Sequence, residues 1–234
     1  MIKNSYFCRA IPQLIKLLVV GEPAHLKECR LKFQDHDLWH IESHDEAGNL
    51  TSYDVVFDFI IDRHVERFQI YAANALSVFL NTATTTLASI VLSRRGPMQC
   101  TVFGFNGFPS LFNREFLEVC LLRGEDTPRL EKLCKSLKTG LSIVDDRVGL
   151  VTPRIICMII NEAYYTVQEK TATREDIDLA MKLGTNYPYG PFEWCTKIGL
   201  KDVYELLEAM YRDTHDERYK ISALMKKEYL ATIL

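Results

Sequence analysis

The first half of the chain alternates short apolar runs with segments of helical spacing. Leu14–Val20 is one such run, closed by Gly21, and this pattern is typical of a buried strand in a parallel sheet. Further strands are predicted at Asp37–Glu42, Asp54–Ile61, Val78–Thr82 and Gln99–Phe105, with a segment of helical spacing at Val65–Ala75. Strands that alternate with helical segments predict an α/β domain with a mostly parallel sheet.

The pattern changes after about Asp145, where apolar residues begin to recur every three to four positions. Thr173 is a predicted helix N-cap because an acidic first turn follows it, and Tyr187–Pro191 is a rigid break between helices. The spacing predicts helices over 153–169, 174–183, 200–214 and 222–230. We therefore expect an α/β domain over residues 1–145 and an all-α domain over residues 146–234.

Composition and charge argue against several classes of partner. The chain is 47% hydrophobic and 25% charged, as in ordinary globular proteins, and its net charge is −3. That charge gives no reason to expect nucleic acid or an anionic membrane surface as a partner. No apolar run approaches the roughly 20 residues that span a bilayer, and the first residues lack the pattern of a signal peptide. We expect a cytoplasmic protein.

Neither the cysteines nor the histidines predict a metal site. The seven cysteines are scattered and form no CxxC pair, so we expect reduced, packed thiols. His36, His40 and His44 recur at every fourth position, but a strand over Leu38–Glu42 would place His40 on a polar face. No Cys or second His cluster completes a coordination set, so we predict solvent-facing histidines and no metal.

The helical half carries the motifs that identify a family. Glu175–Gly184 followed by Tyr187–Glu193 resembles the C-terminal signature of the 3-hydroxyacyl-CoA dehydrogenases, which reads very nearly EDID-AMKLG-GYP-GPFE. Two more segments are similar to the family: Gly199–Val203 to its following turn and helix, and Asn161–Ala163, which comes after Arg154, to its NEA helix. The resemblance runs from about residue 149 to the last residue of the chain.

The first half resembles the same family more faintly. Asp54–Asp58 is similar to its DLVIEA strand, Asn81–Thr82 to its NTSS strand end and Phe116–Val119 to its LVEV strand. Between Gly21 and Asp54 the chain is some tens of residues shorter than the family. The resemblance thus implies a truncated, Rossmann-like domain that lacks a helix or two.

The resemblance also implies where the chemistry would lie. The family oxidises 3-hydroxyacyl-CoA by passing hydride to NAD, while a histidine, oriented by a glutamate, takes the hydroxyl proton. Here Asn106 stands at the place of the histidine, and Glu118 stands at the place of the glutamate. An amide has no accessible proton-accepting state, and losing a general base typically costs about 10²–10⁴ in rate. Pro153 replaces an asparagine that would contact the substrate.

Further positions around the implied site differ from the family as well. Ala83 replaces a serine, although the hydroxyl of Thr84 is nearby in sequence. Arg67 stands where the family has a lysine, and Asp62 where it has an acid near cofactor and substrate. By resemblance, Ala83, Thr84 and Arg67 are substrate-side positions.

The nucleotide loop keeps one glycine of the G-x-G-x-x-G pattern. Gly21 is followed by Glu22, which adds negative charge, by Pro23, which has no N–H, and by Leu26 at the third glycine position. In this fold an acidic residue about twenty positions after the first glycine binds the ribose hydroxyls, and Glu42 lies there. The implied cofactor-binding positions are Gly21, Glu42, Asp62 and Asn81. We expect NAD to bind weakly or not at all.

Three functions remain open from the sequence. The favoured one is a catalytically degenerate family member that keeps a homodimer through its C-terminal helices and possible contact with acyl-CoA. The second is an active NAD-dependent dehydrogenase that uses Glu118 as an atypical base. The third is a structural partner of an intact dehydrogenase.

Overall fold

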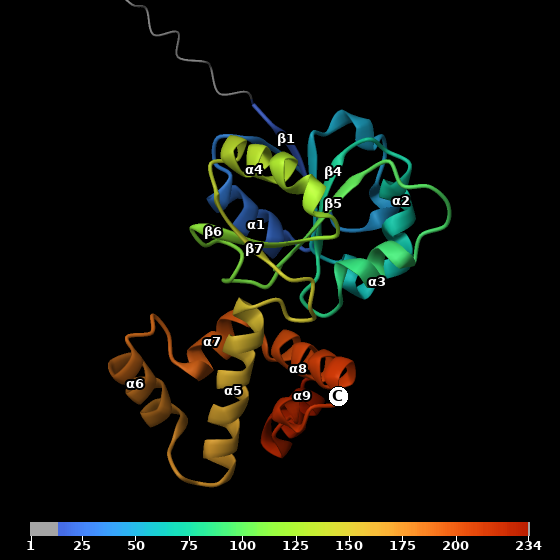
Figure 1. The fold of residues 1–234 in the computed structure, drawn as a ribbon. Coiled ribbons are helices and arrows are strands. Elements are labelled where there is room, and N and C mark those ends of the chain that lie inside the picture. The colour runs from blue at the N-terminus through green and yellow to red at the C-terminus, as the bar shows by residue number, and fades with distance from the viewer. Residues whose placement is uncertain (1–13, 234) are drawn as a thin grey trace, which may run out of the picture.

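The computed structural model describes residues 14–233. Its first part is a seven-stranded sheet covered by helices, and its second part is a group of helices below that sheet (Figure 1). The strands are β1 (Lys16–Val20), β2 (Asp37–Ile41), β3 (Val55–Asp58), β4 (Ser77–Asn81), β5 (Thr101–Phe105), β6 (Phe116–Leu121) and β7 (Gly140–Val144). The mostly parallel sheet predicted from the sequence is confirmed.

The strand order β2-β1-β3-β4-β5-β6-β7 places the first crossovers on opposite sides of β1. The strands β1 to β5 are all parallel, β6 runs antiparallel to β5, and β7 is parallel to β6. In an open parallel sheet, ligands bind outside the carboxyl ends of the strands where the order reverses. Here that point lies between β1 and β3, next to Gly21.

Helices cover both faces of the sheet, because the strands β1, β3 and β4 are almost wholly apolar and need cover on each side. The helices α1 (Pro23–Lys32) and α4 (Thr127–Ser136) share one apolar core with one face. The helices α2 (Gln69–Ala72) and α3 (Leu87–Leu92) share a second core with the other face. The two pairs lie on opposite sides in Figure 1.

The connection between β2 and β3 is short. It contains only two single-turn 3₁₀ helices, His44–Glu46 and Leu50–Ser52. Two more 3₁₀ turns, Ile61–Arg63 and Val65–Phe68, lead into α2, so the segment predicted as helical over 65–75 is part 3₁₀ and part α. No α-helix lies between β2 and β3, a segment that the structure describes throughout.

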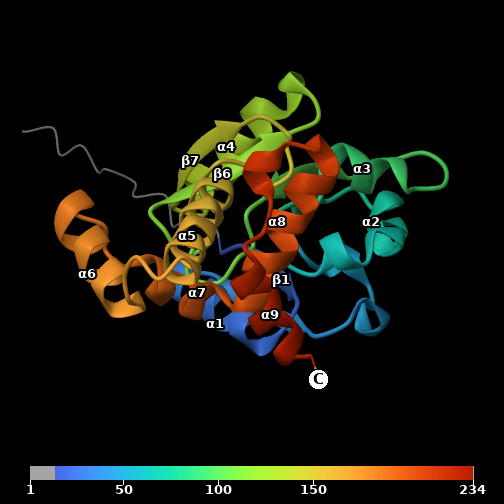
Figure 2. The same ribbon diagram turned by 90° about the horizontal axis from the view of Figure 1, so that it is seen from below.

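The second part consists of α5 (Thr152–Gln168), α6 (Arg174–Thr185), α7 (Pro191–Ile198), α8 (Leu200–Thr214) and α9 (Ala223–Ala231). The helices α5, α7, α8 and α9 surround one apolar core, whereas α6 has no buried residue and stands apart in Figure 2. Four of these helices match the prediction within two residues. The helix α7 was not predicted, because it begins at Pro191, the last residue of the segment Tyr187–Pro191 that we interpreted as a break.

The signature motif has a structural explanation in the contact between α6 and α7. The Asp178 carboxylate of α6 accepts hydrogen bonds from the backbone N–H groups of Phe192 (2.8 Å) and Glu193 (3.1 Å), and so caps α7. A Cβ on Gly190 would lie 2.4 Å from the Asp178 side chain, so glycine is required there. The Glu193 carboxylate in turn accepts from the Gly190 N–H (3.0 Å) and from Lys182 (2.6 Å). The motif therefore fixes the angle between two helices.

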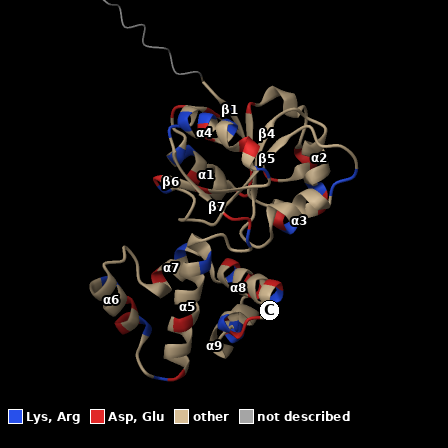
Figure 3. Ribbon diagram, in the orientation of Figure 1, with Lys and Arg blue, Asp and Glu red and all other residues tan. Residues whose placement is uncertain are grey.

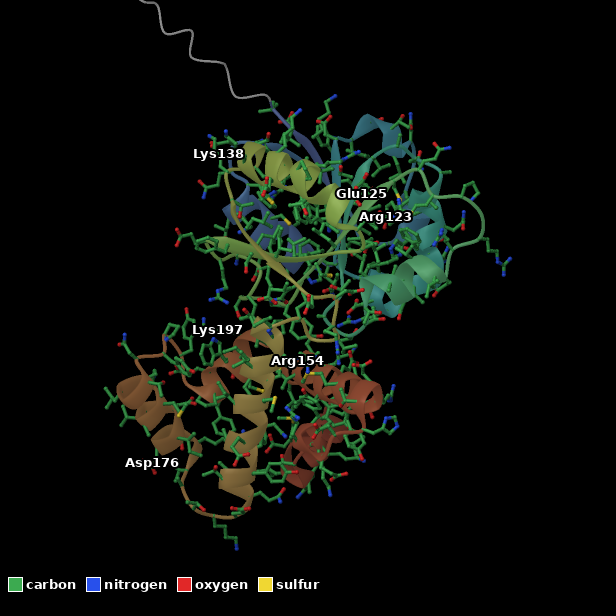
Figure 4. All side chains as sticks on the ribbon, viewed as in Figure 1. Arg123, Glu125, Lys138, Arg154, Asp176 and Lys197 are labelled. Carbon is green, nitrogen blue, oxygen red and sulfur yellow. The ribbon has the colours of Figure 1, made fainter. Side chains whose placement is uncertain are left out.

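Several polar contacts connect the two parts. The Asp146 carboxylate accepts from the N–H groups of Leu87 (2.7 Å) and Ala88 (2.8 Å) at the start of α3, and the Gly149 N–H donates to the Ala83 carbonyl (2.8 Å). Arg154, at the end of α5 nearest the sheet in Figure 4, donates to the carbonyls of Leu150 and Val148. The linker is thus held by hydrogen bonds on both sides.

Charged residues of both signs are spread over both parts (Figure 3). Within residues 14–233, no helix is both long and apolar enough to cross a membrane.

Candidate functional site

A cavity of about 440 Å³ lies where the antiparallel strand β6 meets the start of α5. Its size is that of an ordinary small-ligand pocket. Both residues of the implied catalytic pair, Asn106 and Glu118, line it. The other lining residues are Leu111, Arg114, Glu115, Phe116, Leu117, Leu141, Ser142 and Thr152. The structure therefore brings the pair predicted from the sequence into one cavity, which we call the β6–α5 cleft.

Asn106 follows the last residue of β5 and is 3% exposed. Its Oδ1 accepts a hydrogen bond from the Phe108 N–H at 3.0 Å, which fixes the amide orientation. Among the described residues, its Nδ2 has no hydrogen-bond acceptor. The side chain thus presents a hydrogen-bond donor, and no base, to whatever enters the cleft.

Glu118 is held by the first turn of α5. One carboxylate oxygen accepts from the Val151 N–H (2.8 Å), and the other from the Thr152 N–H (3.0 Å) and the Thr152 hydroxyl (2.7 Å). These are the groups that a helix leaves unsatisfied at its start, and a negative charge there is favoured. Glu118 therefore serves as the cap of α5, and its oxygens are already occupied.

Pro153 and Ala83 lie close to the same junction but offer no polar side chain. Pro153 occupies the first turn of α5, where a missing N–H costs little. Ala83 is fully buried; its N–H donates to Asn81 Oδ1 (3.2 Å), and its carbonyl accepts from Gly149. Both positions are structural in this chain.

The nucleotide loop is filled by a side chain of the protein. The Glu22 N–H donates to His25 Nδ1 (3.0 Å), and the His25 imidazole stacks on the Phe59 ring with centroids 4.6 Å apart. Gly21 has a φ of 149°, and a Cβ there would lie 2.6 Å from His25 Nδ1. Burial lowers the pKa of His25 to about 4, so the ring is neutral near pH 7.

This loop does not fit a dinucleotide pyrophosphate. Such a group is held by free backbone N–H groups at the start of the first helix. Here the N–H of Glu22 is bonded to His25, Pro23 has none, and the N–H of His25 bonds back to the Glu22 carbonyl (2.9 Å). The remaining hollow is about 50 Å³, too small for a dinucleotide, and acidic Glu22, Asp62 and Asp202 line it.

Asn81 and Asp62 lie beside this loop, as expected, but make internal contacts. Asn81 Nδ2 donates to the Phe59 carbonyl (3.1 Å), and its Oδ1 accepts from the Gly107 N–H (3.0 Å). Asp62 Oδ2 accepts from the Thr84 hydroxyl (2.8 Å), whereas its buried Oδ1 has no partner among the described residues. Desolvation by burial raises the pKa of Asp62 to about 7.

Arg67 and Glu42 do not join either cavity. Arg67 is exposed and pairs with Asp45 at 2.8 Å, so its guanidinium is directed to a surface carboxylate. Glu42 is exposed, and its backbone N–H donates to Glu46 Oε1 (3.2 Å). Neither residue has a described contact with the loop or the cleft.

Arg63 is a residue that the sequence analysis missed. It follows β3 and pairs with Asp202 of α8 at 2.6 Å, with Glu22 and Glu205 each at 3.9 Å. It therefore ties the nucleotide loop to the helical part across the place where a cofactor would lie. No sequence pattern pointed to it, because the two partners are 139 positions apart.

The solvent-facing histidines predicted from the sequence are wrong in two of three cases. His36 and His44 are buried, and His44 Nε2 lies 2.7 Å from Asp58 Oδ2, which also accepts from Tyr71 (2.9 Å). His40 is half-buried, with Nε2 2.7 Å from the Gly21 carbonyl. His44 was predicted wrongly because the chain turns into a 3₁₀ helix there, so the alternation of the strand does not continue. His36 lies before β2, and its Nδ1 accepts from the Ile15 N–H (3.4 Å).

Within the described part of the chain, no three His, Cys, Asp or Glu side chains are grouped to hold a metal ion. Six cysteines are free and buried there, as expected for packed thiols, and Cys8 lies outside the described residues. Burial raises the pKa of each of these six, Cys195 to about 11 among them, which makes them poor nucleophiles at neutral pH.

Comparison with known proteins points to one family. The family model described as 3-hydroxyacyl-CoA dehydrogenase, C-terminal domain, matches residues 149–232. A 3-hydroxyadipyl-CoA dehydrogenase of Escherichia coli (strain K12) is 41% identical over 93 residues, which is 40% of this chain and 19% of that protein. A probable 3-hydroxybutyryl-CoA dehydrogenase of Deinococcus radiodurans is 32% identical over 161 residues, 66% of this chain and 56% of that protein.

The fold agrees with these matches. The crystal structure of (S)-3-hydroxybutyryl-CoA dehydrogenase from Ralstonia eutropha superposes with a TM-score of 0.72 at 19% identity, covering 94% of each chain. The chain spans about half the length of the curated 3-hydroxybutyryl-CoA dehydrogenases that it matches in sequence. On its C-terminal domain, its relatives and its fold, the chain belongs to the 3-hydroxyacyl-CoA dehydrogenase family.

Proposed function

We propose that this chain is a catalytically degenerate family member that binds acyl-CoA in the β6–α5 cleft and performs no NAD-dependent oxidation. The observation that carries the proposal is that the His25 side chain occupies the nucleotide loop. Since the neutral His25 ring caps the Glu22 N–H and packs on Phe59, a pyrophosphate would have to displace it and then meet the Glu22 carboxylate.

The cleft supports the same proposal. General-base catalysis needs a group with a pKa near the working pH within reach of the hydroxyl proton. Asn106 supplies only an amide, and Glu118 Oε2 already accepts two hydrogen bonds from Thr152. The alternative of an active dehydrogenase with Glu118 as base would require the start of α5 to give up its cap.

The proposal is tested by titrating the purified chain with NADH and with butyryl-CoA by calorimetry. We expect an NADH dissociation constant of about 1 mM or weaker and measurable binding of the thioester. A micromolar NADH constant would contradict the proposal and favour the active alternative. Binding of neither ligand would favour the third candidate, a structural partner of an intact dehydrogenase.

Turnover provides a second test. We expect no NADH absorbance from 3-hydroxybutyryl-CoA and NAD with the wild-type chain, and none with Asn106→His. The single substitution restores an imidazole, but Pro153, Ala83 and the filled nucleotide loop remain as they are. Turnover by Asn106→His would show that the base alone is missing.

The proposal includes a homodimer through the C-terminal helices. The apolar side chains of Ile155, Leu179 and Leu183 are 50%, 54% and 77% exposed on α5 and α6, so they are available for a contact between two copies of the chain. A two-fold contact would cover them without open-ended assembly. We place the protein in the cytoplasm, a compartment in which its six buried free thiols would stay reduced.

A further inference from the structure

The β6–α5 cleft contains a cation that has no carboxylate partner in the described part of the chain. Arg114 lines the cavity, and its Nη1 donates weakly to the Thr152 hydroxyl at 3.3 Å. Among residues 14–233, no carboxylate lies within ion-pair distance of its guanidinium. An arginine fork matches a carboxylate in geometry and in charge, so this group is free to bind one.

The two acidic residues of the cleft leave that charge available. Glu118 is engaged by the N–H groups of Val151 and Thr152 at the start of α5, which offset its charge locally. Glu115 is exposed on the rim and forms no ion pair with Arg114, although its charge weakens any anion bound there.

The rest of the wall suits a short acyl chain. Leu111 and Leu117 are buried apolar residues of the lining, at 7% and 2% exposure. Asn106 is 3% exposed. Its Nδ2 has no acceptor among the described residues, so it can donate a hydrogen bond to an acyl oxygen. The cleft thus combines an apolar wall, one amide donor and one cation.

We propose that the β6–α5 cleft selects acyl-CoA thioesters whose acyl chain ends in a second carboxylate. The Arg114 guanidinium pairs with that carboxylate, the Asn106 amide donates to an oxygen of the acyl chain, and the leucines cover the methylenes between them. This inference rests on the proposed acyl-CoA binding and deepens it.

A plain alkyl chain fits these residues less well. It would remove water from the Arg114 guanidinium and offer no acceptor in return, and an unpaired charge is costly to desolvate. A dicarboxylic chain of the same length replaces that water with a charge-assisted hydrogen bond. We therefore expect the difference in affinity between the two ligands to depend on Arg114.

The test compares glutaryl-CoA with valeryl-CoA, which have equal numbers of acyl carbons, by calorimetry on the full chain. We expect glutaryl-CoA to bind about tenfold more tightly at low salt. Arg114→Met should reduce this ratio to about one while changing the valeryl-CoA constant less than about threefold, and Arg114→Lys should retain part of the ratio.

Two control variants complete the test. Arg123→Met removes an exposed arginine that pairs with Glu125 (Figure 4) and does not line the cleft, so it should leave the ratio unchanged. Glu115→Gln should increase it, since a competing negative charge is lost. Arg114 is exposed, so its variants are expected to fold, which circular dichroism and the valeryl-CoA constant would confirm.

The outcomes separate the two proposals. Equal binding of the two thioesters, or a preference that survives Arg114→Met, overturns the inference and leaves acyl-CoA binding intact. Absence of binding by both thioesters overturns the proposed function and this inference with it. Loss of the preference in Arg114→Met alone supports the inference.

Discussion

Two residues at positions that the family resemblance implies to be functional are engaged in contacts within the protein. Glu118 is the clearest case, because it accepts hydrogen bonds from Val151 and Thr152 and so begins α5. A residue retained at a catalytic position is therefore no sign of activity when its oxygens are used by a helix. Asp62, an implied cofactor-binding position, is the second case: one oxygen accepts from Thr84, and the other has no partner within residues 14–233.

We predict that Glu118→Ala destabilises the protein by about 2 kcal/mol, since it removes the acceptor of two backbone N–H groups and one hydroxyl. Urea unfolding followed by circular dichroism measures this. Glu115→Ala, three positions away on the exposed rim, is the matched control and should change the unfolding free energy by less than about 0.5 kcal/mol. Equal effects of the two variants would contradict the assigned cap.

Asp62 leads to a prediction about pH. Its folded pKa of about 7 lies above the ordinary value of 3.8, so the folded state holds the proton more tightly than the unfolded state. The resulting stability is complete below about pH 4 and is lost as the pH rises through 7. Asp62→Asn cannot ionise, so the unfolding free energy of the variant minus that of the wild type should rise from pH 4 to 7 and then level off. A difference that is flat with pH would contradict this.

At the scale of elements, the start of a helix is set in both α5 and α7 by a carboxylate from a different element. Asp178 of α6 caps α7, and Gly190 makes room for its side chain. The signature motif thus encodes the contact between two helices.

We predict that Gly190→Ala and Asp178→Ala each destabilise the helical part by about 1–3 kcal/mol. The first adds a Cβ that would lie 2.4 Å from the Asp178 side chain, and the second removes the cap of α7. Thermal unfolding measures both effects. The double variant should cost less than the sum of the two, since both changes act on the same contact. Fully additive effects would show that the two residues act separately.

The elements that could be predicted from the sequence are those whose environment is uniform. The strand β1 lies between two neighbours and is buried, so it is an unbroken apolar run. The edge strand β7 is half-exposed, and a glycine and a serine interrupt its apolar residues, and we did not predict it or the helix α4 before it. The filling of the nucleotide loop by His25 could not be predicted either, because it depends on a stacking contact with Phe59, 34 positions along the chain.

At the scale of the whole molecule, apolar packing as well as hydrogen bonds join the two parts of the chain. Two cores lie on the two faces of the sheet, and a third lies among α5, α7, α8 and α9 and extends to Ala83, Phe108 and Leu111 of the sheet part. The helix α6 has no buried residue, and Leu179 and Leu183 on it are exposed.

We predict a solution mass of twice the chain mass of 27.0 kDa by light scattering at micromolar concentration. Leu183→Asp combined with Ile155→Asp should give a folded monomer, because both side chains are exposed within one chain. Ile156→Asp is the contrasting variant: it places a charge in the core of the chain itself and should unfold the helical part. A monomeric wild type would rule out the homodimer.

The β6–α5 cleft has walls from both parts, Leu117 from the sheet and Thr152 from the first turn of α5. A ligand that fills it touches both and so favours one arrangement of the two parts over all others. Because such coupling is reciprocal, anything that stabilises that arrangement increases the affinity for the ligand by the same factor. A partner subunit on the helices would thereby act as an effector of the cleft without touching it.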